Sequence, residues 1–338
     1  MRAVLCTDFN GIDALIPGNA PDPVPAADEV LIAVNAASVS YMDKLMCEGG
    51  YQMRPELPYV PGTEAAGTVL AVGDKVQDYA PGDRVAAQVW YGGYAEKLVA
   101  KHWRCAHVPG GVDDHVAASV LHNYLAAYAA LVDRCALRSG ETLLVTGATG
   151  GVGMAVLDLG QMLGAKVIAA VGDPAKGELA RSMGASEVVD YNSATLKEDI
   201  RALTNGRGLD VCIDMIGGAT FQTLARVMAW GGRLAPVGFV GGDIPALTMN
   251  LPLLKSYSVV GVFSGAWLDQ CPVDAARAGA EIFQWIANGK LHPRVDRVLP
   301  LNQAADAMRI LDRREVAGRI VLEVTEFNPP FASGLNES

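Results

Sequence analysis

The chain has 338 residues, of which 51% are hydrophobic and 19% are charged. This composition excludes a disordered chain, a collagen and a coiled coil, and the length suits about two globular domains. The formal net charge is −10 and no stretch is rich in Lys or Arg, so we expect no nucleic-acid partner. The six cysteines are scattered without a C-x-x-C pair, which favours a reducing compartment and a cytoplasmic location.

The first part of the chain is predicted to contain short strands. Runs of β-branched and small apolar residues at 28–39, 65–73, 84–89 and 94–100 are separated by turns that contain Gly and Pro. This spacing is typical of a small barrel or sandwich. The uncharged run at 116–132 is shorter than the about 20 apolar residues of a membrane span, so we expect a buried helix there and no membrane association.

From Ser139 onward the pattern alternates between apolar strands and amphipathic helices. Such alternation predicts an α/β domain with a doubly wound parallel sheet that helices cover on both faces. The predicted strands are 142–146, 166–171, 209–214 and 233–237, and the predicted helices are 152–163, 174–183 and 221–229. A helix at 274–287, a strand at 295–299, a helix at 303–311 and a strand at 319–324 are expected after them.

A glycine-rich turn follows the strand at 142–146 directly and opens the next helix. Its sequence runs from Gly147 to Gly153 as GATGGVG, with glycines at every third position. Such a turn lets backbone N–H groups approach a pyrophosphate, which then lies at the positive end of the helix. A packing turn is the alternative, but the strand–turn–helix context favours a dinucleotide site. Its expected binding residues are Thr149, Gly150, Gly151 and Val152.

The end of the second strand bears on which dinucleotide binds. An NAD site usually has an acidic residue there to accept the ribose 2′-OH, but this strand ends at Val171-Gly172. Lys176 offers a cation for a 2′-phosphate, or is a solvated helix residue. Asp173 argues against NADP, unless it caps the helix that begins at Pro174. We therefore expect NADPH.

Four stretches identify a family: 36–51 (AASVSYMDKLMCEGGY), 57–67 (LPYVPGTEAAG), 82–85 (GDRV) and 139–164 (SGETLLVTGATGGVGMAVLDLGQMLG). With them the chain resembles the zinc-independent quinone oxidoreductases of the medium-chain dehydrogenase/reductase superfamily over nearly its whole length. The resemblance implies a GroES-like β-barrel substrate domain and a Rossmann-type NADP-binding domain. It places the first at 1–118, the second at 119–290, a return to the first domain at 291–325 and a tail at 326–338.

The zinc ligands of related alcohol dehydrogenases have no counterpart here. Those enzymes carry a Cys where this chain has Ser40 or Tyr41, and Gly-His-Glu where it has Gly-Thr63-Glu64. Catalytic zinc needs three converging protein ligands. We therefore expect no zinc, and a structural hydrogen-bonding role for Glu64. The segment 102–107 (HWRCAH) only imitates a metal motif, because on a strand its side chains would alternate between faces.

The resemblance implies NADPH-dependent hydride transfer to a quinone or an α,β-unsaturated carbonyl. Tyr41 and Tyr51 match residues of the family's substrate cleft, where each is either a proton donor or a packed aromatic side chain. Ser40 replaces an Asn near the nicotinamide, and Ala126 replaces a Thr that contacts the cofactor. The remaining cofactor residues implied by the resemblance are Gly172, Lys176, Tyr191 and Arg314 for the 2′-phosphate side, and Gly238, Phe239, Phe263 and Ser264 after the late strands.

Three other functions were weighed against this one. A short-chain dehydrogenase would start at its glycine turn and carry Tyr-x-x-x-Lys after it, which this chain does not. An enoyl-thioester reductase would want a basic rim for CoA, and only Arg54 and Lys44 offer one. A non-catalytic NADPH-binding sensor or structural protein stays open because of Ser40 and Ala126. The resemblance also implies a homodimer through the apolar stretch 257–263, which is either an edge or a buried strand.

Overall fold

The computed structural model describes residues 1–313 and 315–324. The chain forms two compact units. The first unit comprises Met1–His122, Pro272–Asn288 and the described residues from Pro293 onward; the second comprises Asn123–Cys271 and Gly289–His292. This division differs from the expected boundary at 290, because helix α10 (Pro272–Ala287) groups with the first unit. Gly279 allows that close packing, since a Cβ there would lie 3.2 Å from the Cβ of Ala106.

The described part of the first unit is built on a seven-stranded sheet in the order β14-β15-β3-β4-β5-β7, with β6 also paired to β3. The central strand β3 (Glu29–Val39) is antiparallel to β4, β6 and β15. Inward-facing Val, Ile and Ala side chains of these strands fill one hydrophobic core. The other strands are β4 (Glu64–Val72), β5 (Arg84–Gln88), β6 (Lys97–Lys101), β7 (Cys105–His107), β14 (Val295–Pro300) and β15 (Arg319–Glu323).

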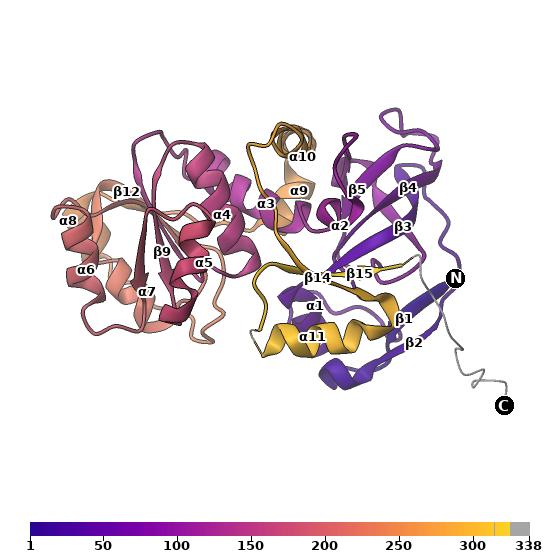
Figure 1. Cartoon of the computed structure of the whole chain (residues 1–338), viewed down its shortest axis with the longest axis horizontal. Helices are drawn as coiled ribbons and strands as arrows, with labels where there is room; N and C mark the ends of the chain where they lie inside the picture. The colour runs from indigo at the N-terminus through magenta and orange to yellow at the C-terminus, as the bar shows by residue number, and fades with distance from the viewer. Residues whose placement is uncertain (314, 325–338) are drawn as a thin grey trace. The chain divides into compact units, whose positions relative to one another are not determined.

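A hairpin and the C-terminal return complete this unit. Strands β1 (Arg2–Cys6) and β2 (Leu15–Asn19), which the sequence did not predict, form a separate two-stranded sheet. The last part of the chain returns as β14, helix α11 (Ala304–Asp312) and β15. In Figure 1 α11 lies beside the short helix α1 (Tyr41–Cys47), and the two helices are in contact. The return therefore covers the segment that bears Ser40 and Tyr41.

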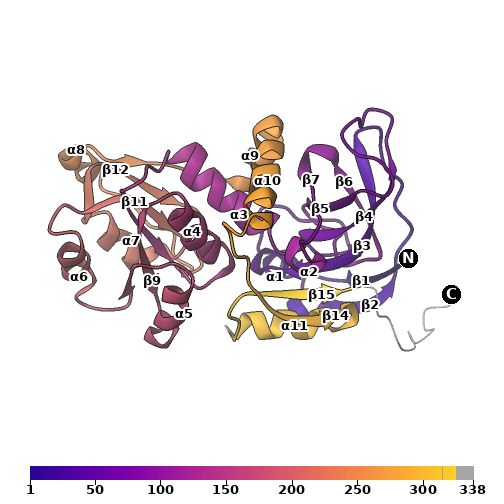
Figure 2. The same ribbon diagram turned by 45° about the horizontal axis from the view of Figure 1, so that its top comes forward.

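The second unit is a parallel sheet in the order β10-β9-β8-β11-β12-β13. The order reverses between β8 and β11, so the carboxyl ends of these two strands form the switch point at which such sheets bind nucleotides. Helices α4 (Gly151–Met162) and α5 (Gly177–Ser182) cover one face, and α6 (Leu196–Leu203) and α7 (Gly218–Leu224) the other (Figures 1 and 2). The strands are β8 (Thr142–Thr146), β9 (Lys166–Val171), β10 (Glu187–Asp190), β11 (Leu209–Asp214), β12 (Met228–Pro236) and β13 (Ser258–Val259).

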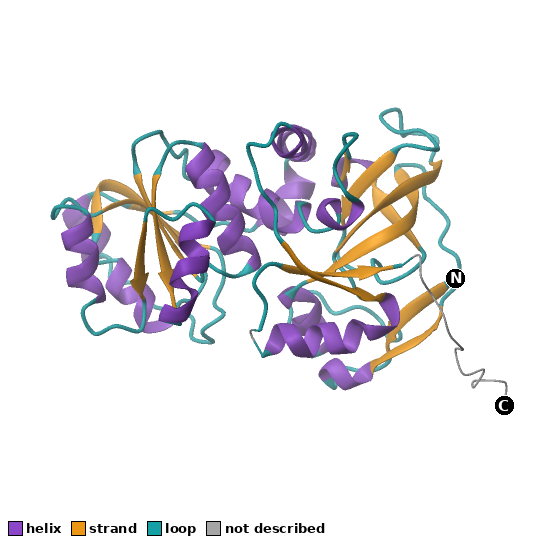
Figure 3. Ribbon diagram, viewed as in Figure 1, coloured by secondary structure: helices purple, strands orange, loops and turns teal. Residues whose placement is uncertain are grey.

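Several helices differ from the sequence prediction. The run 116–132 is not one helix but α2 (Asp114–Ala117), α3 (Leu121–Tyr128) and a π-helical segment (Ala129–Arg134). The helix expected at 221–229 is α7, which ends at Leu224 because the chain enters β12 at Met228. Helices α6, α8 (Asn250–Lys255) and α9 (Ser264–Gln270) were not predicted (Figure 3).

Two open points are resolved by the strand arrangement and the helix lengths. The stretch 257–263 contributes only β13, which lies at the edge of the sheet and is exposed. It is therefore an edge strand rather than a buried one. Within residues 1–313 and 315–324, none of the helices has the length and apolar character that crossing a membrane requires.

Candidate functional site

Three positions of the glycine turn after β8 require glycine, either for the backbone conformation or for lack of space. Gly147 has φ +60°, in the left-handed region that favours glycine. A Cβ on Gly153 would lie 2.2 Å from the carbonyl oxygen of Gly147, and a Cβ on Gly151 would lie 2.8 Å from Oδ1 of Asn123. Gly150 is the N-cap of α4 and has no side chain to accept from the first N–H groups of the helix. Those donors suit the pyrophosphate of a dinucleotide.

A buried carboxylate next to this turn is a site residue that the sequence analysis missed. Asp214, the last residue of β11, is 0% exposed. Its Oδ1 accepts hydrogen bonds from Thr146 Oγ1 (2.7 Å) and Ile216 N (3.2 Å), and its Oδ2 accepts one from Gly217 N (3.1 Å). Thr146 Oγ1 in turn accepts from Met215 N (2.8 Å). Burial raises the pKa of Asp214, and these hydrogen bonds oppose that rise.

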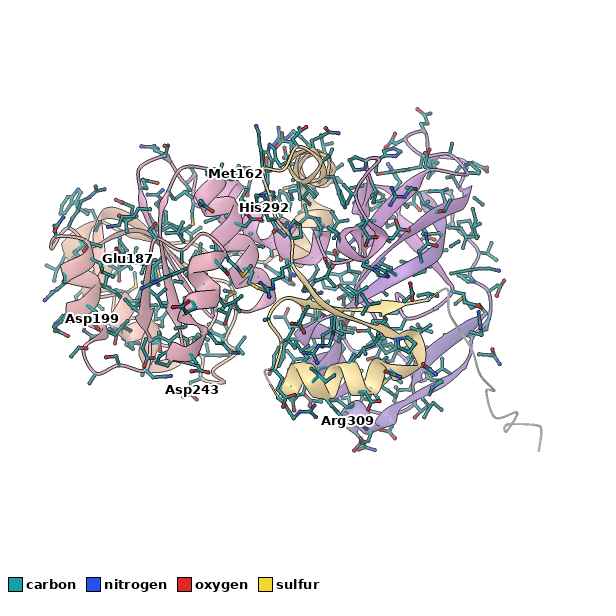
Figure 4. The ribbon with its side chains drawn as sticks, in the orientation of Figure 1. Met162, Glu187, Asp199, Asp243, His292 and Arg309 are labelled. Atoms are coloured by element: carbon teal, nitrogen blue, oxygen red, sulfur yellow. The ribbon has the colours of Figure 1, made fainter. Side chains whose placement is uncertain are left out.

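The loop after β12 is hydrogen-bonded to the turn that Asp214 organises. Val240 N donates to the carbonyl oxygen of Met215 (2.9 Å), and Gly241 N donates to that of Ile216 (3.0 Å). This loop carries Gly238 and Phe239, so both expected cofactor residues lie at the carboxyl end of the sheet. Asp243 at its end accepts a hydrogen bond from Gly218 N (3.0 Å), and Figure 4 labels it at the edge toward which the strand arrows point.

The ends of β9 and β10 bring together two residues expected to contact a 2′-phosphate, Gly172 and Tyr191, and a third, Lys176, follows in the next helix. A Cβ on Gly172 would lie 2.2 Å from Oη of Tyr191, so the tyrosine hydroxyl lies directly against Gly172. Asp173 Oδ1 accepts from Ala175 N (2.9 Å) and caps the 3-10 helix Pro174–Lys176. Lys176 is the last residue of that short helix. The capping alternative for Asp173 is therefore the one observed, and its carboxylate is engaged with the backbone.

The other expected cofactor residues of the second unit lie on α3 and around α9. Ala126 is buried in α3, and its methyl group cannot replace the polar contact of a threonine. Ser264 begins α9, and Phe263 before it is half-exposed. Trp267 of α9 packs on Tyr128, with ring centroids 6.4 Å apart. Arg314, the last expected contact, lies outside the described residues.

In the first unit, Ser40 is the N-cap of α1 and forms a capping box with Asp43. Ser40 Oγ accepts from Asp43 N (3.1 Å) and donates to Asp43 Oδ2 (2.8 Å), and Ser40 N also donates to Oδ2 (2.7 Å). Tyr94 Oη donates to the same oxygen (2.9 Å). Ser40 Oγ is also 3.1 Å from Thr63 Oγ1. Ser40 therefore holds the start of α1, and burial raises the pKa of Asp43.

The two expected substrate residues lie at the start of α1 and shortly after its end. Tyr41 is the first residue of the helix and is 40% exposed, with Lys44 Nζ 5.6 Å from its ring centroid. Tyr51 follows the helix and is half-buried. Burial raises the pKa of Tyr51, so its hydroxyl is protonated at neutral pH and able to donate a hydrogen bond.

The positions that hold zinc in related enzymes form a buried hydrogen-bonded cluster here. Glu64 accepts from Ser38 Oγ (3.0 Å) and from His122 N (3.1 Å), and lies 3.7 Å from Arg319 Nη2. Burial raises the pKa of Glu64 to about 7 and lowers that of His122 to about 3. Glu64 thus has the structural hydrogen-bonding role predicted for it.

The segment 102–107 differs in structure from the expected strand. Residues His102–Arg104 form a 3-10 helix, and only Cys105–His107 are extended, so the alternation predicted for the whole segment is wrong. His102 Nδ1 lies 3.1 Å from Asp78 Oδ2, and His107 Nε2 lies 3.0 Å from the carbonyl oxygen of Asp78. In the part of the chain that the structure describes, there is no group of three or more His, Cys, Asp or Glu side chains that could hold a metal ion.

Comparison with known proteins gives matches over nearly the whole chain. A family model for the alcohol dehydrogenase GroES-like domain matches residues 26–129, and one for zinc-binding dehydrogenase matches 151–278. Quinone oxidoreductase-like protein 2 of Bos taurus is 35% identical over 96% of this chain and 92% of its own length. Quinone oxidoreductase of Homo sapiens is 30% identical over 95% of this chain and 97% of its own length.

Solved structures give a similar result. Mycobacterial Rv1454c complexed with NADPH superposes with a TM-score of 0.88 at 30% identity, covering 96% of this chain and 100% of that one. Together with the GroES-like match and the parallel sheet, this similarity confirms the predicted fold class, a GroES-like domain plus a Rossmann-type sheet.

The buried position of Glu64 predicts a pH-dependent contribution to stability. Its folded pKa of about 7 lies above the unfolded value of 4.5, so the contribution is fully present below pH 4.5 and is lost as the pH rises through 7. Relative to Glu64→Gln, the wild-type free energy of unfolding should therefore fall by about 2 kcal/mol between pH 5 and pH 8. Urea unfolding at both pH values measures this, with the exposed Glu178→Gln as control. A constant difference between the wild type and Glu64→Gln would contradict it.

Proposed function

Because the chain belongs to the quinone oxidoreductase family of the medium-chain dehydrogenase/reductase superfamily, we propose that it transfers a hydride from NADPH to a quinone or an α,β-unsaturated carbonyl compound, without zinc. The observation that carries the proposal is the glycine turn beside the Asp214 hydrogen bonds, at the switch point of the parallel sheet. This arrangement fits a dinucleotide, since the first N–H groups of α4 have no side-chain cap at Gly150.

Residues suited to each part of NADPH are proposed, most of them in the second unit. The start of α4, from Thr149 to Val152, would hold the pyrophosphate. Lys176 would supply positive charge to the 2′-phosphate, and Asp173 caps the short helix that ends at Lys176. Gly172, Tyr191 and Arg314 would complete that side, although Arg314 lies outside the described residues. The residues proposed near the nicotinamide are Ser40, Ala126, Gly238, Phe239, Phe263 and Ser264.

The cofactor supplies the hydride, and the protein positions the acceptor and excludes water. A quinone or an enone is already electrophilic, so its reduction does not require a Lewis acid. Tyr41 and Tyr51 are proposed to donate a hydrogen bond to the carbonyl oxygen as negative charge develops on it. The chemistry of the former zinc positions agrees with a zinc-independent reaction, because Ser40 and Thr63 are hydroxyls and Glu64 is bound to Ser38 and His122.

Purified protein should oxidise NADPH in the presence of 1,2-naphthoquinone or 9,10-phenanthrenequinone, measured as loss of reduced-nicotinamide absorbance. A panel that adds simple enones and enoyl-CoA thioesters identifies the acceptor class, and a chelator or added zinc should leave the rate unchanged. Faster turnover of enoyl-CoA than of any quinone would favour a thioester reductase. Tight NADPH binding without turnover of any acceptor would favour a non-catalytic sensor and contradict the proposed reaction.

Substitution of Lys176 tests the cofactor preference. We expect Lys176→Ala to raise the KM for NADPH about 10-fold, which corresponds to about 1.4 kcal/mol, and to leave the KM for NADH unchanged. Only NADPH carries the 2′-phosphate, so a specific contact must affect one cofactor alone. Lys166→Ala is the matched control, because Lys166 is exposed at the opposite end of β9. Equal changes in the KM for NADPH and the KM for NADH would contradict a contact between Lys176 and the 2′-phosphate.

The exposed edge of the parallel sheet supports a homodimer. β13 is an edge strand, and its Val259 is 45% exposed. An unpaired apolar edge is a surface for pairing with a second copy. Val259→Asp should therefore convert a dimer to a monomer in light scattering, whereas Val24→Asp, at an exposed position of the first unit, should not. A wild-type protein that is monomeric at micromolar concentration would contradict the dimer.

We also propose a cytoplasmic location, since all six cysteines are free thiols; cell fractionation tests it.

A further inference from the structure

Two cysteines far apart in the sequence lie side by side in the core of the first unit. Cys6 is the last residue of β1, and Cys47 is the last residue of α1, about 40 residues later. Both side chains are 0% exposed and belong to the same hydrophobic cluster. Each thiol shifts the pKa of the other, as neighbouring side chains do, and Tyr59 contacts both residues. Neither residue has a part in the proposed hydride transfer.

Tyr59 forms hydrogen bonds with both cysteine residues. Its backbone pairs with Cys6, through Cys6 N to the Tyr59 carbonyl oxygen (2.8 Å) and Tyr59 N to the Cys6 carbonyl oxygen (3.2 Å). Its hydroxyl donates to Cys47 Sγ (3.6 Å), and Cys6 Sγ donates to the carbonyl oxygen of Asp8 (3.0 Å). Each sulfur atom thus has a hydrogen-bond partner of its own, the tyrosine hydroxyl for Cys47 and the backbone of Asp8 for Cys6.

The two thiols are made chemically unequal by their interactions. The interaction with Cys47 lowers the pKa of Cys6 although burial opposes it, whereas the interaction with Cys6 and burial both raise the pKa of Cys47. Cys6 therefore has the greater thiolate character of the pair. Elsewhere, burial raises the pKa of Cys105 to about 12 and that of Cys135 to about 11, which makes those thiols less reactive.

We propose that Cys6 and Cys47 form a dithiol modification site at which hydrogen peroxide converts the two thiols to a disulfide. The Cys6 thiolate attacks the peroxide oxygen, which breaks the O–O bond, forms a sulfenic acid and releases water after protonation. Cys47 sulfur then attacks the sulfenic sulfur, the S–O bond breaks and a second water leaves with the Cys47 proton. Two thiols are oxidised and one peroxide is reduced to two waters, so the step needs no other reactant.

Access to the buried pair requires only local opening. β1 is paired in register with β2, its core residues Val4 and Cys6 are buried, and backbone hydrogen bonds join it to Tyr59, Tyr94 and Glu96 of the rest of the unit. Such a hairpin opens at lower free energy than a strand in the centre of the seven-stranded sheet. The disulfide would then tie the end of β1 to the end of α1, and closing a loop of about 40 residues restricts the unfolded chain.

The test uses the whole protein, purified under reducing conditions and then exposed to excess hydrogen peroxide. Remaining thiols are alkylated in denaturant as the protein unfolds, and tryptic peptides are analysed by mass spectrometry without reduction. Cleavage after Lys44 separates the two cysteines, so a disulfide appears as two linked peptides. Cys6→Ala and Cys47→Ala are compared with Cys105→Ala, which removes an equally buried thiol of the same unit.

We expect the linked pair in the wild type and in Cys105→Ala, and its absence in the other two variants. Oxidation should also raise the thermal midpoint of the wild type by about 5 °C, reversibly with dithiothreitol, and should not raise that of Cys6→Ala. Three results would each overturn the proposal: both thiols recovered in reduced form, sulfinic acid on Cys6 without a link, or a link to a different cysteine. None of them depends on NADPH or quinone turnover, so the outcome is independent of the proposed reaction.

Discussion

The hydrogen bond between Thr146 and Asp214 holds together the part of the sheet on which the candidate cofactor site depends. Thr146 ends β8 and immediately precedes the glycine turn, while Asp214 ends β11 and precedes the loop to α7. Two adjacent parallel strands can end at the same edge without their loops being ordered. Here one carboxylate and one hydroxyl accept from the backbone N–H groups of Met215, Ile216 and Gly217, so the loop has no unsatisfied donor at its start. The loop after β12 then forms its hydrogen bonds to this ordered segment.

A different buried acid performs a related task in the first unit. Glu64 begins β4, and its carboxyl group joins Ser38 of β3, His122 at the start of α3 and Arg319 of β15. A buried carboxylate is unfavourable unless charge and hydrogen bonds compensate it, and the Arg319 side chain supplies that charge from the C-terminal return. The return is therefore needed for electrostatic reasons as well as for packing, because without β15 the acid would be left without its cation.

Short apolar runs bounded by turn residues were predictable because their signal is local. The strands at 142–146, 166–171 and 209–214 were expected with the bounds that the structure shows. The run 116–132 misled the prediction, since its uniform alanine-rich composition contains no sign of the break between α2 and α3. The role of Asp214 was not predictable, because its partner Thr146 is 68 residues away and meets it only through strand pairing. Asp173 could be foreseen as a cap, since its partner is two residues further on.

Helix capping also explains the role of Ser40, which lies at an expected cofactor position and is the N-cap of α1. Ser40 or Tyr41 stands where related zinc enzymes are expected to have a ligand, and the hydroxyl and backbone N–H of Ser40 both bind Asp43 at the start of α1. Replacing such a serine by a cysteine would remove the cap, which typically costs about 1 kcal/mol, and would leave the buried Asp43 carboxylate with one donor fewer. The hydrogen bonds of Ser40 therefore oppose a cysteine at this position. The same bonds position Tyr41, the next residue, at the exposed first turn of the helix.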